Sequence, residues 1–162
     1  MGIFQYIFYH FQSYTTCQSY TTLSDYPIIF EQRVAWGDMD AFGHVNNVVY
    51  YRYIESARLC YFDQLKILQQ GVFTVVASNQ CQYMRPVVYP DVLKIGVRVE
   101  ELRNSAMRMH YLIYSETQQT IVAQAEAVIV CVDHVNMQKT LIPENVRASI
   151  HKIEKTVQHI LD

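Results

Sequence analysis

The chain is poor in glycine, and the glycine-rich motifs of nucleotide chemistry are missing from it. Its 162 residues include five glycines, with neither a phosphate-cradling GxxxxGK[ST] loop nor a dinucleotide-binding GxGxxG. A GxSxG nucleophile elbow and an HExxH zinc helix are absent as well. These absences argue against nucleotide hydrolysis, NAD chemistry, and the serine hydrolases and zinc proteases that carry those motifs.

Excess positive charge and clustered cysteine are also lacking. Thirteen basic residues against fifteen acidic ones give a formal charge of -2, so we expect no nucleic-acid partner. The four cysteines, at positions 17, 60, 81 and 131, are too widely spaced for a CxxC redox pair or a zinc site, and histidine spacing does not suggest a metal either. Cys60, Cys81 and Cys131 fall in apolar stretches, where reduced thiols pack as small hydrophobic groups. We expect no metal and no cofactor.

No apolar run reaches the roughly 20 residues that a membrane span needs. The first 26 residues are rich in Tyr, Phe, Gln, Ser and Thr, but they contain no Lys or Arg, and their apolar run is interrupted. A signal peptide needs a basic start and a continuous apolar segment. We therefore expect a cytoplasmic protein without membrane association, in which residues 1–27 form an atypical leader and residues 28–162 form one domain.

What is present is a regular succession of apolar periodicities. The sequence predicts a strand over 28–36, a loop over 37–47 that ends in a helix-capping Asn, a long amphipathic helix from Tyr50 to near Gly71, strands over 72–83, 93–100, 107–116 and 121–133, and a closing helix from Pro143 to the end. The strict alternation over 93–100 is typical of a half-buried strand. This order favours an α+β fold in which one antiparallel sheet wraps a single helix. Because a sheet covers only one side of a helix, we expect a homodimer or a dimer of dimers.

Ionisable and amide side chains are concentrated between the first strand and the long helix, as Asp38, Asp40, His44, Asn46 and Asn47. The start of a helix offers unpaired N–H groups that can hold a developing oxyanion. A carboxylate such as Asp40 beside it can attack a carbonyl or take a proton from water. The structural alternative is that Asp38 and Asn46 are turn and cap residues and that His44 only hydrogen-bonds to the loop backbone.

The stretch from Trp36 to Tyr50, WGDMDAFGHVNNVVY, resembles the signature of the 4-hydroxybenzoyl-CoA thioesterase-like family of the hotdog fold. The likeness continues through the helix, YMRPVVYPD over 83–91 and the later strands, and covers roughly residues 28–135. It implies that Asp40 is the catalytic carboxylate, that His44 and Asn47 lie near the reacting group, and that Arg85 belongs to the substrate-binding region. Phe42 stands where relatives acting on acyl-carrier-protein thioesters have Asn, which favours Asp40 acting with water.

The resemblance implies hydrolysis of an acyl-CoA to a free acid and coenzyme A. Apolar and aromatic side chains at Phe42, Tyr50, Tyr53 and Tyr83 are candidates for the wall of an acyl tunnel, with a mild preference for medium to long chains. Glu55 of the long helix is expected on a solvated face. Four alternatives stay open: a protein that binds acyl thioesters or acyl chains without turnover, a thioesterase acting on acyl-carrier protein, a dehydratase of the same fold, and a homodimer with a purely structural role.

Overall fold

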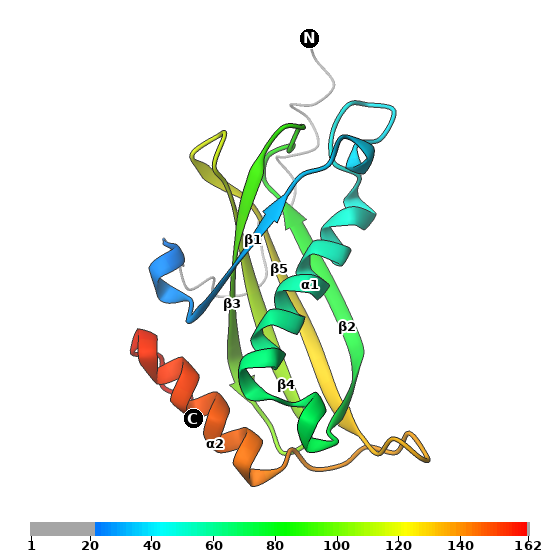
Figure 1. Ribbon diagram of the computed structural model, residues 1–162, viewed down its shortest axis with the longest axis vertical. Helices are drawn as coiled ribbons and strands as arrows, with labels where there is room; N and C mark the ends of the chain where they lie inside the picture. The colour runs from blue at the N-terminus through cyan, green and yellow to red at the C-terminus, as the bar shows by residue number, and fades with distance from the viewer. Residues whose placement is uncertain (1–21, 162) are drawn as a thin grey trace, which may run out of the picture.

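The protein is a five-stranded antiparallel sheet that wraps one long helix, as the computed structural model of residues 22–161 shows (Figure 1). The sheet order is β1-β3-β4-β5-β2. The main elements are β1 (Ile28–Arg33), α1 (Asn47–Leu65), β2 (Phe73–Tyr83), β3 (Val92–Leu102), β4 (Ala106–Ser115), β5 (Thr120–Val132) and α2 (Glu144–Glu154), with 3-10 turns η1 (Leu23–Asp25), η2 (Trp36–Asp38), η3 (Leu68–Gln70) and η4 (Lys155–Val157). This architecture confirms the predicted fold class.

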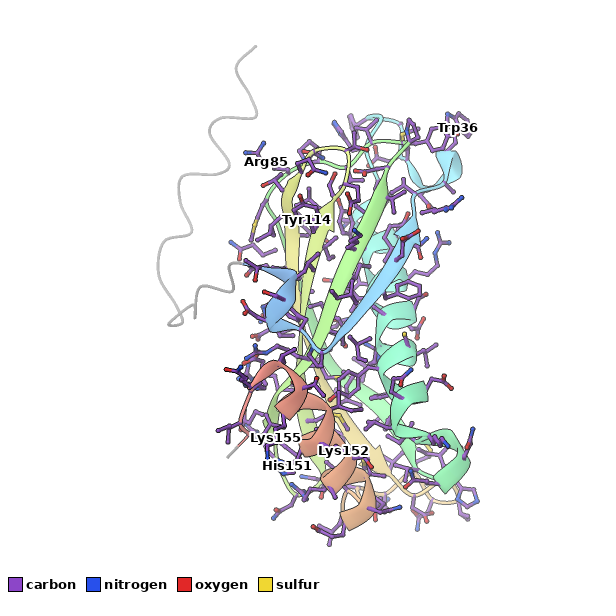
Figure 2. The ribbon with its side chains drawn as sticks, turned by 60° about the vertical axis from the view of Figure 1, so that its left-hand side comes forward. Trp36, Arg85, Tyr114, His151, Lys152 and Lys155 are labelled. Carbon is purple, nitrogen blue, oxygen red and sulfur yellow. The ribbon has the colours of Figure 1, made fainter. Side chains whose placement is uncertain are left out.

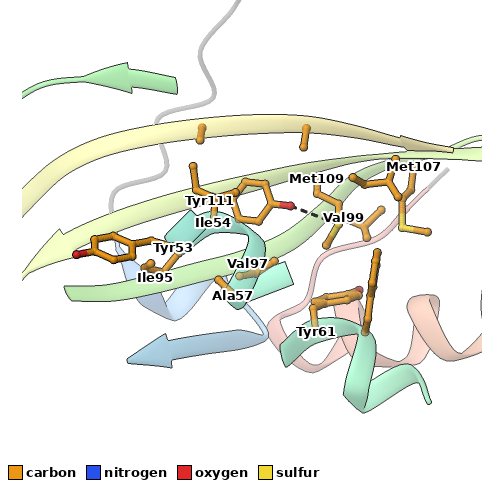
Figure 3. Packing of buried hydrophobic residues seen from close by; sticks show 14 of the residues in the cluster. Tyr53, Ile54, Ala57, Tyr61, Ile95, Val97, Val99, Met107, Met109 and Tyr111 are labelled. Carbon is orange, nitrogen blue, oxygen red and sulfur yellow. Dashed lines mark hydrogen bonds between the residues drawn. The ribbon is translucent and has the colours of Figure 1, made fainter. Parts of the chain in front are cut away.

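The core lies between α1 and the concave face of the sheet. The period-two residues of β3, Leu93, Ile95, Val97 and Val99, are all fully buried, as their alternation predicts. Figure 3 shows α1 residues such as Ile54, Ala57 and Tyr61 packed over β3 and over Met107, Met109 and Tyr111 of β4. One continuous apolar cluster thus joins the helix to the sheet and holds the start of α1 in place.

The predicted capping Asn is confirmed as Asn46, whose side-chain oxygen accepts the N–H of Val48 at 3.0 Å. The helix begins at Asn47, earlier than predicted, and ends at Leu65 because Lys66 adopts a left-handed conformation with φ 53°. The prediction that it continues to near Gly71 was wrong, since a separate 3-10 turn occupies residues 68–70.

The predicted first strand was also too long, because β1 ends at Arg33 and the Val34 N–H turns to the carbonyl of Asp91 at 3.0 Å. The closing helix ends at Glu154 rather than at the chain end. The prediction of a half-buried β3 was wrong in one respect, since Arg98 on its outer face is only 6% exposed. Tyr26 packs against Gly96 there, and His159 covers Arg98 from the other end of the chain.

The free thiols agree with prediction where the structure describes them. Cys131 is buried, and Cys60 and Cys81 are half-buried, with no disulfide between them. Cys17 lies outside the described residues. Residues 22–26 belong to the stretch assigned to the leader, and Tyr26 contacts the sheet, with its hydroxyl 2.9 Å from Nδ1 of His110. The boundary at residue 27 stays a prediction.

Candidate active site

The loop before α1 is fixed by backbone hydrogen bonds. Met39 and Val45 form an isolated antiparallel bridge, and the Asp40 N–H donates to the His44 carbonyl at 2.8 Å. The Gly43 N–H returns to the Asp40 carbonyl at 3.0 Å, and Gly43 sits at φ 78°, a conformation that glycine adopts without strain. The loop therefore presents Asp40 and His44 together next to the first turn of α1.

Asp38 is a structural carboxylate. It is buried and accepts hydrogen bonds from the Ala35 N–H at 2.9 Å and from the side chains of Tyr53 and Arg52. Burial alone would raise the pKa of Asp38, but these hydrogen bonds and the charge of Arg52 outweigh it and lower the pKa below its usual value. Asp38 therefore stays ionised and ties the loop to α1.

Asp40 is half-buried, and its carboxylate makes fewer hydrogen bonds than that of Asp38. Its Oδ1 accepts the Phe42 N–H at 2.8 Å, which closes a small turn. Its Oδ2 accepts no hydrogen bond from residues 22–161. One oxygen thus orients the carboxylate, and the other is free to act on a substrate or on water.

The first turn of α1 supplies a free backbone donor. The Val48 N–H donates to the Asn46 side chain and the Val49 N–H to the Asn46 carbonyl, at 3.0 and 2.9 Å. Within the described part of the chain, the Asn47 N–H has no acceptor. A backbone N–H at a helix start can stabilise an oxyanion, because the positive end of the helix dipole is added to the hydrogen bond.

The other predicted site residues gather at the same end of the molecule. His44 is half-buried, and its imidazole makes no hydrogen bond within the described range. The Asn47 side chain is exposed, and the backbone carbonyl of Asn47 accepts the Tyr83 hydroxyl at 3.2 Å. Arg85 is exposed, and its segment lies along the loop because the Val45 N–H donates to the Val87 carbonyl at 2.8 Å. Figure 2 shows Arg85 and Trp36 at this end, opposite Lys152 and Lys155.

The aromatic candidates for a tunnel wall have different surroundings. Tyr50 is buried and meets the Tyr83 ring edge-on at 5.0 Å, and its burial raises its pKa to about 12. The Tyr53 hydroxyl donates a hydrogen bond to the Asp38 carboxylate. The Phe42 side chain, in contrast, is 81% exposed. Burial also raises the pKa of Cys81, to about 11, so its sulfur is a neutral thiol and a poor nucleophile.

Sequence reasoning missed the residues that brace the loop. Arg52 and Tyr53 hold Asp38, and no spacing rule links them to it. Asp91 is a second buried carboxylate, which accepts the Ser115 hydroxyl at 2.5 Å and the Thr117 N–H at 3.0 Å. Its carbonyl receives the Val34 N–H, so it supports the strand that leads into the loop.

Residues 22–161 contain no group of three or more His, Cys, Asp or Glu side chains arranged to hold a metal ion. No helix in the same range is long and apolar enough to cross a membrane.

An antiparallel sheet wrapped around one helix, with a carboxylate loop at the helix start, agrees with a hotdog-fold thioesterase. The chain belongs to the thioesterase-like superfamily, whose family profile matches residues 34–150. This membership confirms the predicted resemblance, and it confirms at the level of the family that the chain is a thioester hydrolase.

Individual relatives agree with that membership. YsmA of Bacillus subtilis is 38% identical over 81 residues, 49% of this chain and 55% of YsmA, so the match spans about half of that relative. The acyl-CoA thioester hydrolase YbgC of Escherichia coli O6:H1 is 28% identical over 121 residues, 72% of this chain and 90% of YbgC. A thioesterase of Thermus thermophilus, solved with coenzyme A and Zn, is 32% identical with a TM-score of 0.72, covering 80% of this chain and 96% of that one.

Proposed function

We propose that the protein hydrolyses acyl-CoA thioesters to a free acid and coenzyme A, with Asp40 as nucleophile or general base. One observation carries the proposal: a lightly bonded carboxylate lies in a braced loop beside a helix start whose Asn47 N–H is free. YbgC, named an acyl-CoA thioester hydrolase, and the Thermus thioesterase solved with coenzyme A support the choice of substrate.

Two reaction routes fit this arrangement. In the first, Oδ2 of Asp40 attacks the thioester carbonyl carbon, the C–S bond breaks, and the leaving thiolate takes a proton from solvent. Water then hydrolyses the mixed anhydride, which releases the free acid and restores the Asp40 carboxylate. In the second, Oδ2 takes a proton from water, the hydroxide adds to the carbonyl, and the proton passes to the departing sulfur. In both, the Asn47 N–H donates to the carbonyl oxygen as negative charge builds on it.

The remaining predicted residues take supporting roles in this proposal. The His44 imidazole and the Asn47 side chain orient the thioester or the attacking water. The exposed Arg85 guanidinium contacts a phosphate of coenzyme A, for which its fixed fork of donors is well suited. Asp38 does not touch the substrate and keeps the loop in register with α1. No metal or cofactor takes part. The active form is a cytoplasmic homodimer whose second copy completes the site.

Thiol release from short, medium, long and aromatic acyl-CoAs tests the proposal and identifies the acyl group. We expect release by the wild type and a loss of kcat/KM of about 100-fold or more in Asp40→Asn, since general-base or nucleophilic groups contribute at least that much. Asp63→Asn is the matched control, because Asp63 is an exposed acid near the far end of α1. It should retain wild-type turnover.

The other outcomes are informative. Full activity in Asp40→Asn would show that hydrolysis does not depend on this carboxylate. Thiol release from acyl-carrier protein alone would change the substrate to that carrier. Thermal stabilisation by acyl-CoA without any thiol release would instead indicate a binding protein.

A further inference from the structure

The Asn47 N–H, the proposed oxyanion donor, belongs to a helix turn that is fixed mainly by its own hydrogen bonds. The Asn46 side chain and carbonyl accept the N–H groups of Val48 and Val49, and the Asn46 N–H donates to the Asp38 carbonyl at 2.9 Å. These bonds set the shape of the turn and join it to the loop. They do not set its position relative to the sheet, because none of them reaches a strand.

The Tyr83 side chain makes the connection to the sheet. Tyr83 is the last residue of β2, and its hydroxyl donates to the backbone carbonyl of Asn47 at 3.2 Å. Within residues 22–161, no other hydrogen bond joins a strand to residues 46–49. Asn47 therefore offers its N–H to a substrate while its carbonyl is held by the sheet.

The surroundings of Tyr83 keep its hydroxyl in place as a donor. Its ring meets the buried Tyr50 ring edge-on, with the centroids 5.0 Å apart. Burial, together with the neighbouring Cys81 and Tyr51 side chains, raises the pKa of Tyr83 well above its usual value. The hydroxyl therefore keeps its proton through the neutral pH range and can donate it to a carbonyl.

The strand end that carries Tyr83 is itself attached to the rest of the sheet. The N–H groups of Met84 and Arg85 both donate to the Val122 carbonyl of β5, at 2.8 and 3.1 Å. Arg85, which is proposed to contact a phosphate of coenzyme A, follows Tyr83 by two positions. A series of short contacts therefore leads from β5 through Tyr83 to the residue that offers the oxyanion donor.

We infer that Tyr83 is a positioning residue of the thioesterase reaction, which holds the Asn47 N–H at the correct distance from the thioester carbonyl oxygen. The inference rests on the proposed function and adds a residue to it. Oxyanion stabilisation needs donors that are fixed before the reaction, and a displacement of about 1 Å can lower a rate about 100-fold. Because Tyr83 acts through Asn47, its effect should appear in the transition state and not in substrate binding.

Tyr83→Phe tests the inference, because it removes the hydroxyl and keeps the ring that packs against Tyr50. We expect kcat for acyl-CoA hydrolysis to fall about tenfold with KM unchanged, a smaller loss than removal of an oxyanion donor itself causes. Tyr114→Phe is the matched control, since the Tyr114 hydroxyl bonds to the Gln119 side chain at 3.2 Å at the β4–β5 turn. Glu55→Gln is a second control, because the Glu55 side chain is 62% exposed, which confirms its predicted solvated position. Both controls should keep the wild-type kcat.

Two analogues of acyl-CoA separate positioning from a general disturbance of the site. An alkyl thioether of coenzyme A has no carbonyl oxygen, so wild type and Tyr83→Phe should bind it with equal affinity. A trifluoromethyl ketone analogue becomes tetrahedral at the carbonyl carbon, as the reaction intermediate does, and Tyr83→Phe should bind it about tenfold more weakly. Equal affinity for the thioether also shows that the variant is folded.

The outcomes distinguish this inference from the proposed function. A Tyr83→Phe protein with wild-type kcat, in an assay where Asp40→Asn shows its expected loss, would overturn the positioning role and leave the proposed function standing. Equal weakening of both analogues would also overturn it, since a disturbed binding site affects the two alike. A wild type that releases no thiol would overturn the proposed function and this inference with it.

Discussion

The end of β3 that extends beyond β1 and the outer edge of β2 differ in how their backbone groups are satisfied. Beyond β1, residues 98–102 of β3 would form a free edge, but the C-terminal segment closes it. Glu154 accepts the Val99 N–H at 2.8 Å, and Nε2 of His159 donates to the Val99 carbonyl at 3.0 Å. Two side chains thus imitate a strand partner. At β2, no such group is supplied by residues 22–161. The described chain therefore satisfies the backbone of β3 beyond β1 and leaves the outer backbone groups of β2 without a partner from residues 22–161.

Breaking the cap should have the largest effect. Glu154 also accepts the Tyr61 hydroxyl at 2.6 Å, so Glu154→Ala leaves two buried donors without an acceptor. We expect the free energy of unfolding to fall by about 3–5 kcal/mol near neutral or mildly acid pH, since each unsatisfied buried donor costs about 1–3 kcal/mol and the lost side chain leaves a cavity. Urea denaturation measures this loss. Lys152→Ala, an exposed change on the same helix, is the control, and an equal loss there would refute the capping role.

A change of pH should weaken the same cap to a smaller extent. Burial raises the pKa of Glu154 to about 7, against an ordinary value of 4.5, and the hydrogen bonds from Tyr61 and Val99 and the charge of Arg98 only partly offset it. The folded protein therefore keeps a proton that the unfolded chain loses, and the stabilisation is complete below about pH 4.5 and lost as pH rises through about 7. Between about pH 5 and 8 this amounts to about 2–3 kcal/mol.

Glu154→Gln isolates this contribution, because it keeps the acceptor and cannot ionise. Burial lowers the pKa of His110 and of His159, which destabilises the fold toward acid pH in both proteins alike. The difference in unfolding free energy between wild type and Glu154→Gln should therefore follow Glu154 alone. A difference that stays constant across this pH range would contradict the raised pKa.

A charge placed on the outer edge of β2 should have the smallest effect on folding. Asn79 is exposed on β2, and Asn79→Lys should change the free energy of unfolding of the isolated chain by no more than about 0.5 kcal/mol. The same lysine should prevent strand pairing and shift the protein to monomers, as read by light scattering. Exposed Gln158→Lys, near the capped edge, should leave assembly intact. An Asn79→Lys protein that remains fully dimeric would show that the proposed homodimer does not pair along this edge.

Much of the fold could be predicted because the local pattern and the tertiary environment agree. The core could be predicted from two patterns. Ile54, Ala57 and Tyr61 recur at three- and four-residue steps on the helix side, and the alternating residues of β3 supply the sheet side. The end of α1 could not be predicted, since Lys66 is an ordinary helix former that takes a left-handed conformation only when the chain must turn toward β2. The burial of Arg98 could not be predicted either, because its covering groups come from the two ends of the described chain.

The site was predictable to a lesser degree. Position in the loop favoured Asp40 over Asp38 as the reactive carboxylate, and the family resemblance strengthened that choice. The structure distinguishes them by their hydrogen-bond partners. The Asp38 carboxylate accepts hydrogen bonds from the side chains of Arg52 and Tyr53, which are distant in the chain, whereas the Asp40 carboxylate accepts one from the Phe42 N–H of its own turn. The free Asn47 N–H could be located only once the N-cap was known to be Asn46. The catalytic role of Asp40 stays a prediction until thiol release is measured.

Arg98 links parts of the protein that the sequence keeps farthest apart. Its guanidinium donates to the Asp25 carbonyl at 3.1 Å and lies 3.1 Å from Nδ1 of His159, while it also faces the ring of Tyr26. Segments near both ends of the described chain therefore contact the same side chain of β3. Fraying at one end should therefore loosen the other, so we expect the amides of η1 and η4 to gain hydrogen exchange together rather than independently.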